Sequence, residues 1–324
     1  MKQITALLAG VAISALAATA ANAQTKWDMP TPYGDGNFHT KNVVQFTKDV
    51  EKATGGKLTI AVHSNGSLIK HPEIKSSVRR GVAPIGEVLI SLHQNESPVY
   101  GVDSVPFLAT SYAAARKLYA AQKPFLEKKL AEEGLVLLFS VPWPSQGIYA
   151  KKEIKSIDDL KGLKFRTYNA STQRIAQLAG AIPTQIEVPD IPTAFATNRV
   201  DAMITSPSTG ADTKAWDYLS HFHHTQAWLP RNVVFVQKAA FDALPADVKA
   251  SVLKAAKEAE DRGWKASEAE TDEKIKVMAG NKMQIIQPSA ALTKGFAEIG
   301  KTMTAEWEKL AGADGKTILD AFRK

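Results

Sequence analysis

The segment LVLLFSV at residues 135–141 is the feature that most restricts how this chain folds. A strand with one face in water alternates apolar and polar residues, whereas this run is apolar on both faces. We therefore expect a central strand in a sheet that is covered on each side. Helix-like and strand-like segments follow one another through the rest of the chain, so the sequence predicts an α/β fold.

Two prolines, Pro142 and Pro144, follow this run. Proline has no N–H to donate to a strand ladder, so the chain is expected to leave the sheet here and cross into a second domain. A chain of 324 residues is long enough for two domains. We expect lobe I to comprise residues 24–143 and about 232–272, and lobe II to comprise residues 144–231 and about 273–324.

Local patterns predict the other elements. Leu58, Ile60 and Val62 alternate as in a strand, directly after the glycine pair 55–56 that ends the preceding helix. Residues 156–159 offer a capping-box pattern ahead of a short helical turn. Further helices are expected at about 43–53, 72–80, 112–133, 171–179 and 192–198, with strands at about 163–168 and 200–204.

Residues 246–279 lack proline and are rich in Ala, Lys and Glu, which predicts one long helix. At 1.5 Å per residue it would span ~50 Å and lie across both domains. Gly263 lies inside it and is expected to weaken the helix and mark a bend.

The N-terminus has the pattern of a secretory signal peptide. Lys2 precedes an apolar run, and the small-x-small sequence Ala21-Asn22-Ala23 provides a cleavage site. Residues 1–23 are therefore expected to direct export to the periplasm and to be removed, leaving Gln24 first. The alternative, a retained membrane anchor, is disfavoured because polar residues follow at once.

Composition and missing motifs exclude several classes of function. The net charge of +7 comes without a Lys/Arg block, so no nucleic-acid partner is expected, and the absence of cysteine excludes disulfides and thiolate chemistry. No hydrolase elbow, zinc-protease pair or phosphate-binding loop is found. His221, His223 and His224 resemble part of a zinc site, but a polar strand end is the favoured interpretation. We therefore expect that the protein is not an enzyme and that it binds no metal or cofactor.

Arg166 ends the predicted strand at residues 163–168. Ligands of open α/β folds bind outside the carboxyl ends of strands, and a guanidinium holds a carboxylate with two parallel hydrogen bonds. From spacing alone, an ordinary surface arginine is the favoured interpretation and a carboxylate-binding arginine is the alternative.

Four short motifs are found along the chain after residue 23: TGGKL at 54–58, PEI at 72–74 with RG at 80–81, VPFL at 105–108 and DLKGLKFR at 159–166. Through them the sequence resembles, over nearly the whole chain after residue 23, the substrate-binding subunits of tripartite ATP-independent periplasmic (TRAP) transporters, the DctP family. The resemblance implies two α/β lobes hinged around a cleft, with a long helix bracing both. It also implies that the arginine ending the last and most specific motif, here Arg166, binds the ligand carboxylate.

Two departures from the family pattern restrict the class of ligand that we expect. Binders of sugar acids carry a second arginine where this chain has Gln146 and Tyr149, and an acidic motif where this chain reads DAMITSPSTG at 201–210. The sequence therefore favours a small monocarboxylate with few hydroxyl groups. The subgroup that it most resembles, through NFHT at 37–40, Asn95-Glu96 and Trp143-Pro144, includes binders of pyroglutamate.

The expected pocket combines an arginine with aromatic walls and hydroxyl groups, including Thr205. Trp143 is either a core residue or a platform for the ligand, and Glu87 either accepts a ligand N–H or is a structural carboxylate bonded to local backbone amides. The expected ligand contacts are Phe38, Glu87, Trp143, Gln146, Arg166, Tyr168, Ser206, Thr209, Trp228 and Asn232.

Taken together, these features predict a monomeric, two-lobe solute-binding protein that hands a small organic carboxylate to TRAP membrane subunits. A periplasmic enzyme acting on an organic acid, or a sensor-receptor subunit, is the alternative that the sequence leaves open.

Overall fold

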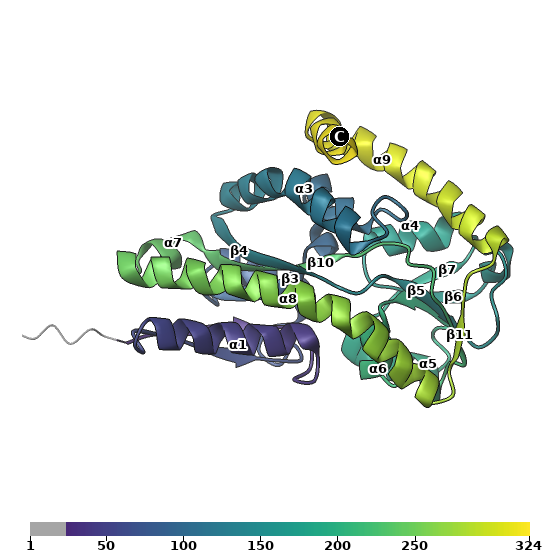
Figure 1. The fold of residues 1–324 in the computed structure, drawn as a ribbon, viewed down its shortest axis with the longest axis horizontal. Helices are drawn as coiled ribbons and strands as arrows, with labels where there is room; N and C mark the ends of the chain where they lie inside the picture. The colour runs from purple at the N-terminus through teal and green to yellow at the C-terminus, as the bar shows by residue number, and fades with distance from the viewer. Residues whose placement is uncertain (1–23) are drawn as a thin grey trace, which may run out of the picture.

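The computed structural model describes residues 24–324, so the predicted signal peptide lies outside the described residues. Within that part of the chain, the strands form two separate groups (Figure 1). We call the part around the three-stranded sheet lobe I and the part around the six-stranded sheet lobe II.

Lobe I contains an antiparallel sheet in which β10 (Arg231–Gln237) lies between β3 (Ile85–Leu89) and β4 (Leu135–Pro142). A parallel pair, β1 (Thr25–Pro30) and β2 (Leu58–His63), lies beside it. In lobe II the order is β11 (Gln284–Ile286), β9 (His221–His223), β5 (Gly147–Ala150), β8 (Ala202–Thr205), β6 (Lys164–Thr167) and β7 (Ile182–Gln185).

The helices cover the faces of these sheets. Those of lobe I are α1 (Phe38–Ala53), α2 (His71–Arg79), α3 (Tyr112–Glu132) and α7 (Lys238–Asp242), and those of lobe II are α4 (Ala170–Leu178), α5 (Ile191–Ala196) and α6 (Pro207–Asp212). Short 3₁₀ turns are η1 (Ile90–His93), η2 (Pro98–Ser104), η3 (Ile157–Leu160), η4 (Val188–Asp190) and η5 (Ala215–Asp217). The predicted capping box is present at η3, where the Asp159 carboxylate accepts the N–H of Ser156 at 2.9 Å.

The apolar run 135–141 forms a strand, but the prediction that it is central is wrong. β4 is an edge strand, and the central position belongs to β10, whose residues 231–236 are all buried. The reason is that α3 and the long helix α8 (Ala246–Gly280) pack against β4 and exclude water from an edge position. Apolar character reports burial of the two faces, not the number of neighbouring strands.

The chain crosses between the lobes where the prolines predict. β4 ends at Pro142 and β5 begins at Gly147 in the other sheet, while the return crossing runs from β9 to β10. The two crossings are hydrogen-bonded to each other, from Trp143 N–H to Pro230 O at 2.8 Å and from Gln146 N–H to Trp228 O at 2.9 Å. This pair of segments connects the lobes; a hinge at this place and the exact lobe boundaries remain predictions.

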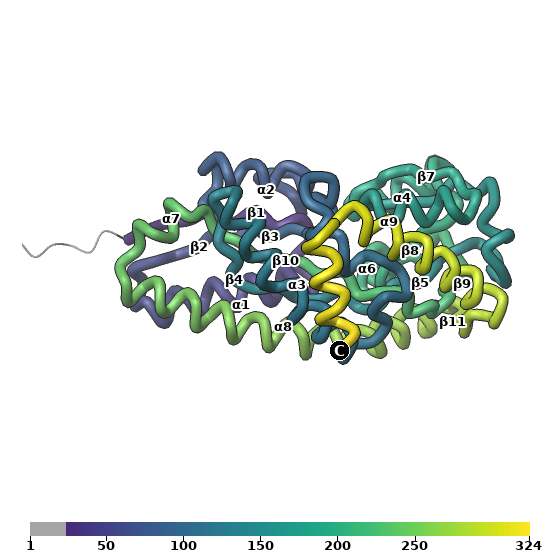
Figure 2. Tube along the Cα trace, turned by 90° about the horizontal axis from the view of Figure 1, so that it is seen from above, coloured from purple at the N-terminus to yellow at the C-terminus, as the bar shows by residue number. Residues whose placement is uncertain are grey.

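The long helix α8 (Ala246–Gly280) is continuous and runs along both lobes (Figures 1 and 2). It packs against α1 and β4 in lobe I and against α6 and β11 in lobe II. Gly263 has a role in close packing, because a Cβ there would lie 2.4 Å from Cγ2 of Val141 and 2.8 Å from Nδ2 of Asn42. A second long element, α9 (Ala290–Arg323), contacts both α4 and α3 and is interrupted by non-helical geometry at Gly312.

The hydrophobic core extends through both lobes. Phe46 and Phe139 pack with ring centroids 5.2 Å apart in lobe I, and Tyr149 and Phe222 at 4.6 Å in lobe II. None of the helices within residues 24–324 has the length and apolar character required to cross a membrane.

Candidate ligand-binding site

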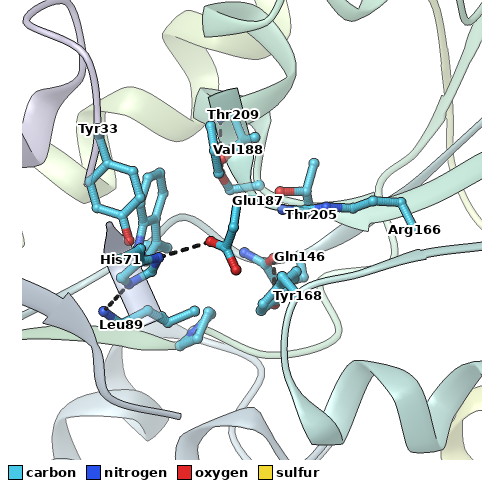
Figure 3. Close-up of a pocket in the computed structure, with 13 residues that line it drawn as sticks. Tyr33, His71, Leu89, Gln146, Arg166, Tyr168, Glu187, Val188, Thr205 and Thr209 are labelled. Atoms are coloured by element: carbon cyan, nitrogen blue, oxygen red, sulfur yellow. Dashed lines mark hydrogen bonds and ion pairs between the residues drawn. The ribbon is translucent and has the colours of Figure 1, made fainter. Parts of the chain in front are cut away.

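A small pocket lies between the lobes, beside the two crossing segments (Figure 3). Residues far apart in the chain meet there because β6 and β8 end at the same edge of their sheet and face α2 and β3 of lobe I. The lining residues are Tyr33, His71, Leu89, Trp143, Gln146, Arg166, Tyr168, Glu187, Val188, Thr205, Ser206, Thr209 and Pro230.

Arg166 extends from β6 into this pocket, as the sequence predicts (Figure 3). It is 1% exposed, its Nε donates to the carbonyl of Ile186 at 2.9 Å, and its guanidinium carbon lies 4.9 Å from the centre of the Tyr168 ring. Burial lowers the pKa of Arg166, opposed by the charge of Glu187. Among the described residues, no carboxylate forms an ion pair with this guanidinium, so a buried cation faces the pocket ready for an anion.

One wall of the pocket is aromatic. The indole of Trp143 meets the ring of Tyr33 edge to face at 4.9 Å, and Phe38 packs behind it at 5.5 Å. Trp143 is 5% exposed yet lines the pocket, so it belongs to the core and to the pocket wall at once. Phe38 does not line the pocket and supports Trp143 from behind.

Gln146 and Tyr168 form a second wall and fix each other. The Tyr168 hydroxyl donates to Oε1 of Gln146 at 3.0 Å, and the Gln146 amide donates to the carbonyl of Pro144 at 2.9 Å. Gln146 thus occupies, with a neutral amide, the region where the resemblance places a second arginine in binders of larger acids.

Hydroxyl groups line the pocket at the start of α6. Ser206 is the N-cap of this helix and accepts the N–H of Thr209 at 3.1 Å, while the two side chains bond each other at 3.2 Å. Thr205, at the end of β8, adds a third hydroxyl. These groups can donate hydrogen bonds to ligand oxygens.

The sequence did not indicate the role of Glu187 and His71, which meet across the pocket. His71 Nε2 accepts the N–H of Leu89 at 3.1 Å, so its Nδ1 carries the proton and donates to Glu187 Oε2 at 3.1 Å. Burial opposes ionisation of Glu187, but the hydrogen bond from His71 and the charge of Arg166 act in the opposite direction, and the net effect is a lowered pKa. Glu187 follows β7, which is parallel to β6, so it lies at the same sheet edge as Arg166. Recognising β7 as a strand would have indicated this position, but the local sequence pattern did not predict that strand.

Three more expected contact residues lie outside the lining. Glu87 is buried and accepts a hydrogen bond from Nδ2 of Asn232 at 3.0 Å, instead of bonding local backbone amides. Burial raises the pKa of Glu87 to about 7. Asn232 lies behind Trp143, and Trp228 is fully buried. The structure therefore groups Trp143, Gln146, Arg166, Tyr168, Ser206 and Thr209 in the pocket and leaves Phe38, Glu87, Trp228 and Asn232 in the layer around it.

The histidines at 221–224 form no metal site: within residues 24–324, no group of three or more His, Asp or Glu side chains is placed to hold an ion. His223 is buried, and its Nε2 accepts the N–H of Ile154 at 2.8 Å.

Comparison with known proteins identifies the family. The profile of bacterial extracellular solute-binding protein family 7, DctP, matches residues 32–310. The chain belongs to this family. Its fold also matches solved receptors: DctP6 of Bordetella pertussis, an extracytoplasmic solute receptor binding pyroglutamic acid, is 49% identical with a TM-score of 0.91 over 92% of this chain and 99% of that one.

Two further relatives show the range of the family. A TRAP solute-binding protein from a marine metagenome, specific for pyroglutamate, is 42% identical with a TM-score of 0.91, covering 93% of this chain and 99% of that one. The C4-dicarboxylate-binding periplasmic protein DctP of Rhodobacter capsulatus is 24% identical over 83% of this chain and 79% of its own length. As a DctP-family member, this chain is an extracytoplasmic solute receptor of the TRAP type and not an enzyme.

Proposed function

We propose that this receptor captures pyroglutamate, or a small cyclic monocarboxylate much like it, in the periplasm. It acts as a monomer and delivers the ligand to TRAP permease subunits. The observation that carries the proposal is the buried Arg166, which faces the pocket without an ion-pair partner among the described residues. A ligand carboxylate would supply that missing charge in a bidentate pair.

The size and lining of the pocket support a small, weakly hydroxylated acid. The pocket is small, with about 30 Å³ of space open to a water-sized group. Its exposed lining is mostly apolar or aromatic, and Arg166 is the only Lys or Arg side chain among the lining residues. A second carboxylate would meet Glu187 or Gln146 instead of a second arginine, which disfavours dicarboxylates. Receptors of 42–49% identity that bind pyroglutamate add support.

Contacts between the lobes support capture by closure. Asn37 Nδ2 donates to Asp212 at 2.8 Å, Asn169 Nδ2 to Ser91 at 2.9 Å, and Ser171 to Gln94 at 2.8 Å. Each bond joins lobe I to lobe II, as contacts in a closed conformation would. A ligand that contacts both lobes would favour this conformation over an open one. Small-angle scattering should show a smaller radius of gyration with ligand, and an unchanged radius at saturation would contradict closure.

A thermal-shift screen tests the proposal directly. The panel is L-pyroglutamate, succinate, a sugar acid, neutral sugars and pyroglutamamide, in which an amide replaces the carboxylate. Ligand at 100 times its Kd stabilises a protein by about 2.7 kcal/mol, which is easily detected. We expect L-pyroglutamate to raise the Tm and pyroglutamamide to leave it unchanged. If no carboxylate raised the Tm while a neutral sugar did, the proposed function would be wrong.

A further inference from the structure

Glu187 has one carboxylate oxygen that the protein leaves without a partner. Its Oε2 accepts the proton of His71, whereas its Oε1 is buried and has no hydrogen-bond partner among residues 24–324. The residue lines the pocket, and its side chain points among the other lining groups (Figure 3). A buried acceptor without a donor costs free energy, so the structure calls for a hydrogen-bond donor at this position.

This acceptor lies next to the cation. Arg166 is anchored through Nε to the carbonyl of Ile186, the residue directly before Glu187. Ile186 is in turn bonded through its own N–H to the carbonyl of Thr167, the residue directly after Arg166, at 3.0 Å. The backbone segments that carry Arg166 and Glu187 are therefore hydrogen-bonded neighbours, and both side chains line the same pocket.

We propose that Oε1 of Glu187 accepts a ligand N–H attached to the carbon that bears the carboxylate, and that this bond selects lactams over other cyclic acids. The proposal rests on the proposed function and names the group that sets its specificity. In a 2-carboxylactam such as pyroglutamate, the carboxylate and the ring N–H branch from one carbon. One ligand can therefore engage Arg166 and Glu187 together.

A ring N–H fits this site better than an ammonium group. The secondary ammonium of an imino acid carries two N–H donors and a charge, which need more than one acceptor once they are buried. Oε2 of Glu187 is already occupied by His71, and the neighbouring lining includes the apolar side chains of Leu89, Val188 and Pro230. A neutral lactam, with one N–H, matches the single free oxygen.

His71 is the positioning residue for this acceptor. It belongs to α2 of lobe I, whereas Glu187 belongs to lobe II, 116 residues away in the sequence. The backbone N–H of Leu89 fixes the tautomer of the imidazole, and the imidazole then fixes which carboxylate oxygen is free. The N–H acceptor is thus completed only when the lobes meet.

Calorimetric titration with three ligands tests the proposal: L-pyroglutamate; its lactone analogue 5-oxotetrahydrofuran-2-carboxylate, in which a ring oxygen replaces N–H; and L-proline. In the wild type we expect the lactone to bind at least about 100-fold more weakly than the lactam, because it brings an oxygen lone pair against a buried carboxylate. Proline should also bind at least about 100-fold more weakly.

Variants test whether Glu187 sets the preference for the lactam over the lactone. Glu187→Gln should weaken binding of the lactam at least about tenfold. It should also strengthen binding of the lactone, because the amide can donate a hydrogen bond to a ring oxygen. The preference for the lactam over the lactone should therefore fall below about tenfold. Glu153→Gln, at a half-exposed carboxylate of lobe II, is the matched control and should leave the preference unchanged. His71→Leu should reduce the preference while the lactone still binds, a result that general damage to the pocket would not give.

Each outcome separates this inference from the proposed function. If the wild type binds the lactone within about threefold of pyroglutamate, or binds proline more tightly, the role of Glu187 is wrong although the receptor still binds a cyclic acid. Equal weakening of lactam and lactone in Glu187→Gln would likewise overturn it. If the wild type binds none of the three, the proposed function itself fails.

Discussion

Trp143 donates its indole N–H to the side-chain oxygen of Asn232 at 2.8 Å, and the same oxygen accepts the hydroxyl of Tyr33 at 3.2 Å. The amide nitrogen of Asn232 donates to Glu87 at 3.0 Å. One side chain at the start of β10 therefore orients both aromatic residues of one pocket wall and is itself oriented by a buried carboxyl group. The sequence places Trp143 and Asn232 in the site, but their contact spans 89 residues and appears only in the fold.

Asn232→Leu should therefore damage both the stability and the pocket. The substitution leaves the Trp143 N–H, the Tyr33 hydroxyl and Glu87 without their partner, at about 1–3 kcal/mol for each buried group left unpaired. Urea denaturation should show the loss of stability, and titration with pyroglutamate should show affinity reduced at least about tenfold. Asn281→Leu, at an exposed amide after α8, is the control. Unchanged affinity in a folded Asn232→Leu protein would show that the walls are positioned by packing alone.

Glu87 should make the stability depend on pH. Burial raises its pKa from 4.5 to about 7 in the folded protein, so the folded state binds its proton more tightly than the unfolded state. The stabilisation from this proton is complete below about pH 4.5 and is lost as the pH rises through about 7, a change of order 3 kcal/mol.

Glu87→Gln isolates this contribution. The amide keeps an oxygen for Asn232 but has no proton to lose, so the variant should lack this part of the decline in unfolding free energy between pH 5 and pH 8. Denaturation of both proteins at the two pH values measures the difference. Parallel pH profiles for the wild type and the variant would show that Glu87 is ionised in the folded protein over this range and that its pKa is not raised.

Position 263 requires glycine because α8 packs closely against neighbouring residues there, a constraint that helix propensity does not show. Alanine favours a helix over glycine by about 1 kcal/mol, so propensity predicts that Gly263→Ala stabilises α8. The contacts of its Cβ with Val141 and Asn42, at 2.4 and 2.8 Å, predict a loss of about 1–3 kcal/mol instead. Gly280→Ala, where nothing lies within 4 Å, is the control and should be neutral or stabilising. A stabilised Gly263→Ala protein would mean that the helix can move away from β4.

Local pattern and family resemblance predicted the elements and Arg166, because both depend on short stretches of sequence. They did not distinguish Glu87 from Glu187. Both are acidic residues at or just beyond a strand, and the choice between them depends on which lobe surface each strand end faces. The same limit applies to β4: apolar residues indicate that both faces are covered, but the pairing that makes β10 central is non-local. The partner of Glu187, His71, lies in the other lobe and has no local signal.

Arg166 is the residue on which the binding of a carboxylate depends most. Arg166→Ala leaves the ligand carboxylate desolvated and without a counter-charge, a loss of roughly 3 to 5 kcal/mol, or two to three orders of magnitude or more in affinity. Arg166→Lys keeps the charge but loses the planar fork, so its affinity should fall between wild type and alanine. Arg166→Met retains much of the volume and removes a buried charge that has no ion-pair partner in the described residues, so the ligand-free Tm should stay the same or rise. Arg174→Ala, at a half-exposed arginine paired with Glu306, is the matched control and should bind as the wild type does. Calorimetric titration with pyroglutamate measures all four variants. If Arg166→Ala is folded and binds within about threefold of the wild type, the carboxylate is held elsewhere in the cleft.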